Sequence, residues 1–154
     1  MTEDEYTCEV EKILADHIEL AARKLTALLP LVPENTRQIE INILVDQGGE
    51  GFLDVRVSLD GPDLYVLNRS IDSHADLFNP VMTEQGLSPA LPLMDSDLED
   101  FPVHDVLADC GARWATAVWA KAGQTTCRFP VKVMSPEGYG TFSRGALHMP
   151  PAAK

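Results

Sequence analysis

The sequence predicts an α+β fold in a single domain that spans residues 1–154. Three observations predict it: an amphipathic helical pattern opens the chain, two segments of alternating apolar residues flank a glycine-rich turn, and a second helical pattern occupies residues 103–122. A chain of 154 residues is long enough for one domain with a buried core. We therefore expect a long N-terminal helix, an antiparallel sheet with a β-hairpin, and a second, largely buried helix.

The first helix is expected to begin after Thr2 and to end near Leu29. Thr2 and Glu5 form a capping-box pattern, and Pro30 follows the expected end. Apolar residues recur along one side and charged residues occupy the opposite side, as in an amphipathic helix that packs on a sheet. The apolar side comprises Tyr6, Val10, Ile13, Ile18, Ala21, Leu25 and Leu28.

Two strands are expected on either side of the glycine-rich turn at residues 46–51. Apolar and polar residues alternate over residues 38–45 and again over 53–59, which predicts an antiparallel hairpin with one buried face. A shorter helix is expected after Pro62 and before Pro80, then a short strand within residues 78–83. Residues 87–102 are rich in proline and acidic residues and are expected to form a surface loop. A last strand is expected at residues 128–134.

The helix expected at residues 103–122 is apolar on two sides. Trp114 belongs to the main apolar face, whereas Trp119 lies among alanines on a nearly opposite face. A helix of this kind buries both faces, either in the centre of the fold or in an interface with another chain. We expect Trp114 in the core. Trp119 is either covered by the C-terminal segment, through Phe129 or Phe142, or is an anchor for another protein.

Charge is the most informative feature of the composition. The net charge is −12, and residues 60–109 hold eleven carboxylates but a single basic residue, Arg69. Contacts with phosphates need clustered Lys and Arg, so this balance argues against direct binding of nucleic acid or of an anionic membrane. It favours a protein partner with a basic surface. The partner-binding residues expected from this reasoning are Asp72, Asp76, Asp95, Asp97, Glu99, Asp100 and Trp119.

The sequence carries no recognisable catalytic motif. The four histidines have no partner at metal-ligand spacing, and the acidic run from Asp95 lacks the glycine and glutamate of a calcium loop. We therefore expect no catalytic residue, no metal site and no cofactor. The three cysteines and the acidic N-terminus are typical of a reduced, cytoplasmic protein without a signal peptide.

In size, acidity, order of elements and acidic loops such as residues 95–100, the chain resembles small acidic immunity proteins of bacterial polymorphic-toxin systems. The resemblance implies a non-enzymatic inhibitor that occludes a cognate toxin domain. Two other hypotheses remain open. The chain is an acidic inhibitor or nucleic-acid mimic that acts on another host or phage protein, or it is a small enzyme whose site is assembled from residues distant in sequence. A homodimer is compatible with each hypothesis.

Overall fold

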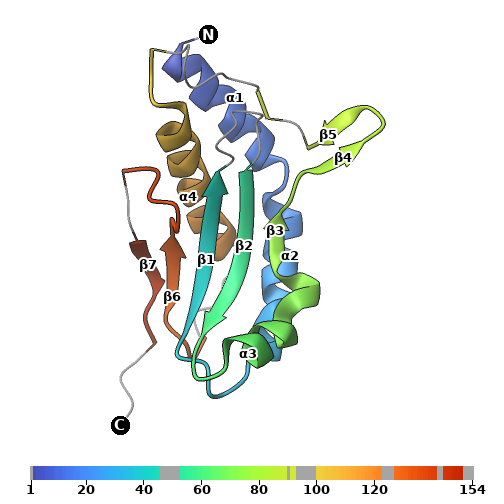
Figure 1. Cartoon of the computed structure of the whole chain (residues 1–154), viewed down its shortest axis with the longest axis vertical. Coiled ribbons are helices and arrows are strands. Elements are labelled where there is room, and N and C mark those ends of the chain that lie inside the picture. The colour runs from blue at the N-terminus through green and yellow to red at the C-terminus, as the bar shows by residue number, and fades with distance from the viewer. Residues whose placement is uncertain are drawn as a thin grey trace.

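The computed structural model describes residues 2–45, 53–89, 91–92, 100–122, 127–141 and 144–150. Three helices, α1, α2 and α4, lie against one face of a five-stranded sheet, and Figure 1 shows them behind the strands. The helices are α1 Glu3–Ala15, α2 Ile18–Leu28, α3 Leu64–Ile71 and α4 Val103–Ala122, with short 3-10 helices at Leu29–Leu31 (η1) and Asp72–His74 (η2). The strands are β1 Gln38–Val45, β2 Leu53–Asp60, β3 Asp76–Phe78, β4 Val81–Thr83, β5 Gly86–Ser88, β6 Val131–Met134 and β7 Arg144–His148.

The main sheet has the strand order β3-β2-β1-β6-β7. The expected hairpin is confirmed as the antiparallel pair β1–β2, in a register that runs from Gln38 opposite Asp60 to Val45 opposite Leu53. β6 pairs with β1 in parallel, so the sheet is mixed. A parallel pair needs a long crossover connection, and α4 is part of that connection. The predicted α+β fold is confirmed, while β7 had not been predicted from the sequence.

The helical segment that was expected to run to Leu29 is divided into α1 and α2. Thr2 caps α1 as expected, because its hydroxyl accepts a hydrogen bond of 3.1 Å from the backbone N–H of Glu5. At the division, the carbonyl oxygen of Leu14 accepts hydrogen bonds from the backbone N–H of His17 and from the indole of Trp114. The chain turns at Asp16 and His17 and then resumes as α2. Trp114, which lies far along the chain, thus contacts the backbone at this interruption.

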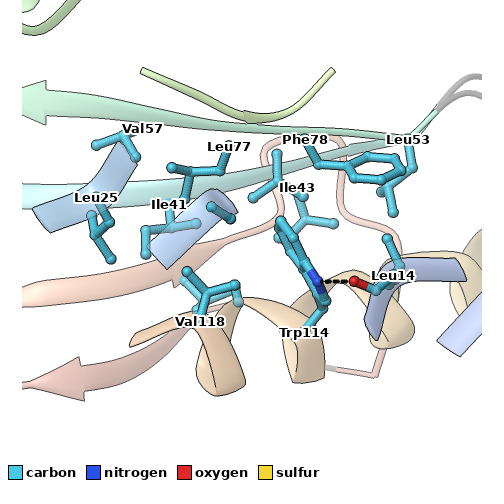
Figure 2. Packing of buried hydrophobic residues seen from close by; sticks show 14 of the residues in the cluster. Leu14, Leu25, Ile41, Ile43, Leu53, Val57, Leu77, Phe78, Trp114 and Val118 are labelled. Carbon is cyan, nitrogen blue, oxygen red and sulfur yellow. Dashed lines mark hydrogen bonds between the residues drawn. The ribbon is translucent and has the colours of Figure 1, made fainter. Parts of the chain in front are cut away.

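α4 packs against α1 and α2 and against β1, β2 and β6 of the sheet. Trp114 is buried, as expected, and its ring contacts Phe78 edge-on with centroids 5.6 Å apart (Figure 2). On the second apolar face Ala108 and Ala115 are fully buried. Gly111 lets α4 approach β1 closely, because a Cβ atom there would lie 2.8 Å from Cγ2 of Ile43. The expectation that α4 is central is therefore confirmed.

Candidate partner-binding face

The face of the main sheet that points away from the helices is polar. Along β1 and β2 every second residue is buried against the helices, and the residues between them are half-buried on the opposite side. We call this opposite side the open face. In the described part of the chain no helix covers it, and it is turned toward the viewer in Figure 1. The open face comprises Gln38, Glu40, Asn42, Leu44, Asp54, Arg56, Ser58, Asp60, Lys132 and Met134.

Arg56 is the centre of a hydrogen-bonded network on the open face. Its guanidinium donates to Oδ1 of Asp76 in β3 at 2.7 Å and to Oδ1 of Asp72 in η2 at 2.6 Å. The hydrogen bond to Asp76 is the main reason why the pKa of Arg56 is raised above its ordinary value. Beside it, the side-chain amide of Asn42 donates to the backbone oxygen of Arg56 and to the hydroxyl of Ser58. The open face is therefore held in a defined geometry.

Asp54 precedes Arg56 by two residues in β2, so both lie on the open face. Its Oδ1 atom is buried and accepts no hydrogen bond from the described residues. Burial raises the pKa of this carboxyl, the charge of Asp76 raises it further, and the nearby Arg56 lowers it. Asp54 is thus a partly desolvated carboxylate without full compensation. The approach of a cation stabilises the ionised form of such a carboxylate.

The structure brings two of the expected partner-binding residues together. Asp72 and Asp76 both bind Arg56, so their charges are partly neutralised within the chain. Asp100 is exposed and precedes α4. Asp95, Asp97 and Glu99 lie outside the described residues.

Trp119, the remaining expected partner-binding residue, is half-buried. Its ring contacts that of His148 in β7, with centroids 5.5 Å apart. The C-terminal strand therefore covers part of Trp119 through His148. Phe142 lies outside the described residues.

Sequence reasoning did not include Glu40, Asp54 and Arg56 among the candidate residues. The signal was present, because each of them alternates with buried valines and isoleucines along β1 or β2. That alternation shows that they point away from the core. It does not show that this side of the sheet lacks a second layer, because the packing of helices is decided by the tertiary structure.

Other polar side chains have structural contacts. Ser73 Oγ lies 2.8 Å from Nδ1 of His74, on an exposed turn, whereas Ser70 donates to a carbonyl of its own helix. Asp105 and Asp109 accept hydrogen bonds from the backbone of Gly140 and Thr141, and so attach the C-terminal segment to α4. Among the described residues there is no group of three or more His, Cys, Asp or Glu that could hold a metal ion. No helix in the same ranges is long and apolar enough to cross a membrane.

Comparison with known proteins gives one match. A family model described as a family of unknown function, DUF6389, matches residues 1–149. No curated protein and no solved structure matches the chain.

Proposed function

This chain belongs to the DUF6389 family, and we propose that it is a non-enzymatic acidic binding protein, an immunity protein that neutralises a bacterial toxin by occluding its basic surface. The observation that carries the proposal is the incompletely compensated carboxylate of Asp54, on a sheet face that no helix of the described residues covers. A lysine or arginine of a partner would place an opposite charge next to this carboxylate.

The surroundings of Asp54 support the same function. Glu40, Asp60 and Asp76 share the open face or its edge, and Arg56 and Lys132 are the basic side chains described there. Because the whole chain has a net charge of −12, its field attracts a basic partner and accelerates encounter. A carboxylate that is retained at a cost in stability is typical of a binding site, since functional residues are often not optimal for folding.

The acidic open face also suggests how a toxin would be inhibited. Toxins that cleave nucleic acids bind phosphates through basic clefts. A rigid sheet face with fixed carboxylates competes with those phosphates for the same cleft. Inhibition then needs no chemistry by the inhibitor, only occupation of the cleft.

Affinity capture from the native host tests the proposal. Wild-type protein is compared with a variant in which Asp54→Asn and Glu40→Gln remove two charges from the open face without changing side-chain size. We expect the wild type to retain a protein with a basic surface, and the double variant to retain less of it, with the largest difference at low salt. The captured protein should be toxic when expressed alone and harmless when co-expressed with the wild type.

Two results would overturn the proposal. In the first, the open-face variant protects cells as well as the wild type and shows unchanged binding at low salt. In the second, the captured protein is not toxic, which would leave an acidic binding protein that is not an immunity protein. Far-ultraviolet circular dichroism of the variant provides the control for folding.

A further inference from the structure

The β4–β5 hairpin projects from the fold. In the described part of the chain its strands, Val81–Thr83 and Gly86–Ser88, pair only with each other and form a sheet of their own. Figure 1 shows the hairpin standing away from the helices and from the main sheet. None of the hydrogen bonds and ion pairs among the described residues joins the hairpin to another element. An isolated two-stranded hairpin is at most marginally stable in water, so this element gains stability from a partner that packs against it.

The tip of the hairpin is nevertheless ordered. Thr83 lies opposite Gly86, so Glu84 and Gln85 form a two-residue loop between them. The hydroxyl of Thr83 donates a hydrogen bond of 2.7 Å to the carbonyl of Gly86 and accepts one of 3.2 Å from the backbone N–H of Gln85. Gly86 has a φ of +106°, which L side chains rarely adopt. The exposed side chains of Glu84 and Gln85 are therefore carried on an ordered backbone, which lowers the entropic cost of binding.

The tip carries the one charged side chain of the hairpin. Residues 79–89 contain Glu84 and no other acidic or basic residue. Glu84 is exposed, and no basic side chain of the described residues forms an ion pair with it. A carboxylate at the end of a projecting hairpin meets a partner that approaches from this side before the body of the protein does. The group that complements it is a Lys or Arg side chain of that partner.

The hairpin continues the edge of the sheet at which the acidic network of the open face lies. Only Asn79 and Pro80 separate β3 from β4, and Asp76 in β3 binds Arg56. A partner that covers the open face therefore meets the hairpin at its β3 edge (Figure 1). A narrow projection makes extensive contact only with a recess, because a flat surface would touch its tip alone.

We propose that the β4–β5 hairpin enters the nucleic-acid-binding cleft of the toxin and that Glu84 binds a Lys or Arg side chain there. This inference rests on the proposed function, because it names the element that occupies the cleft. A cleft that binds phosphates is a recess lined with Lys and Arg. Such a recess matches both the shape of the hairpin and the sign of its single charge. The open face then covers the surface around the cleft.

Photo-cross-linking from the tip tests this assignment. The photoreactive amino acid benzoylphenylalanine is placed at Gln85, beside Glu84, or at Met149 as a control, which is exposed beyond β7 at the other edge of the sheet. The full chain is irradiated in a lysate of the native host, with and without an excess of a phosphorothioate oligonucleotide that competes for phosphate-binding clefts. Mass spectrometry identifies the labelled protein and the labelled residues.

We expect the probe at Gln85 to label a recess rich in Lys and Arg, and the oligonucleotide to suppress this labelling. The probe at Met149 should not label that recess. Glu84→Gln should lower the labelling from Gln85 by about tenfold. Glu9→Gln is the matched control, because it removes the same charge from an exposed position on α1, and it should leave the labelling nearly unchanged.

Three results would overturn the assignment of the hairpin. They are labelling from Gln85 that does not exceed labelling from Met149, labelling that the oligonucleotide leaves unchanged, and an equal effect of the two glutamine variants, which would reduce Glu84 to a contribution to net charge. The proposed function is judged separately. A labelled protein that is not toxic refutes the immunity function and keeps the hairpin contact, whereas a toxin that depends on Asp54 but is not labelled from Gln85 refutes the hairpin contact alone.

Discussion

The indole nitrogen of Trp114 donates a hydrogen bond of 2.6 Å to the carbonyl oxygen of Leu14, at the point where α1 ends (Figure 2). The bond is buried and joins the central helix to the helix that opens the chain. The same carbonyl also accepts the backbone N–H of His17, so the indole is its second donor. The same residue thus fills the core and stabilises the turn between α1 and α2.

Trp114→Phe separates these two contributions. The variant keeps most of the ring but removes the donor, so it should lower the free energy of unfolding by about 1–3 kcal/mol. Trp114→Ala also creates a cavity and should cost about 3–5 kcal/mol. Urea unfolding followed by circular dichroism measures both. If Trp114→Phe is as stable as the wild type, the hydrogen bond to Leu14 contributes no net stability.

Asn68→Ala should weaken the attachment of α3 to the sheet. The substitution leaves the backbone N–H and carbonyl of Leu59 without their side-chain partners, which should cost about 1–3 kcal/mol. Ser70→Ala is the control, because this exposed hydroxyl donates only to the carbonyl of Val66 in its own helix among the contacts seen here. Amide hydrogen exchange should then be faster in α3 of the first variant alone. Equal protection in both variants would contradict the role of Asn68.

Asp54→Asn should stabilise the protein near neutral pH. Because the folded state raises the pKa of Asp54, this residue holds its proton more tightly when folded than when unfolded. The wild type consequently loses stability as the pH rises from the unfolded pKa through the folded one, and the asparagine variant does not undergo this loss. Urea unfolding should show the variant to be the more stable protein at neutral pH, with a smaller difference in acid. A less stable variant at neutral pH would indicate that the Asp54 carboxylate has a favourable partner in the folded state.

Much of the fold could be predicted from local patterns. Thr2 and Glu5 marked the start of α1, Pro62 preceded α3, and the apolar pattern of residues 103–122 matched the bounds of α4. The expected stop of α3 at Pro80 was wrong, because α3 ends at Ile71 and Asp76–Phe78 pairs with β2 as β3. The alternation of Ile41 and Val57 with polar neighbours predicted the β1–β2 hairpin. β7 was missed because its sequence, Arg144–His148, contains glycine and alanine and no strict alternation of apolar and polar residues.

The candidate site was less accessible to sequence reasoning. Asp72 and Asp76 were selected for their charge, and the sequence could not show that Arg56 binds both.

The sequence by itself determined where α1, α3 and α4 begin, the main hairpin and the acidic character of the chain, because each depends on the periodicity or composition of a short segment. The tertiary structure alone decided that β6 joins β1 in parallel, that the indole of Trp114 reaches Leu14, and that Oδ1 of Asp54 has no hydrogen-bond partner among the described residues. These features depend on contacts between residues that are distant in the chain. Such contacts are set by how the apolar faces pack together, and the pattern of any one segment does not encode them.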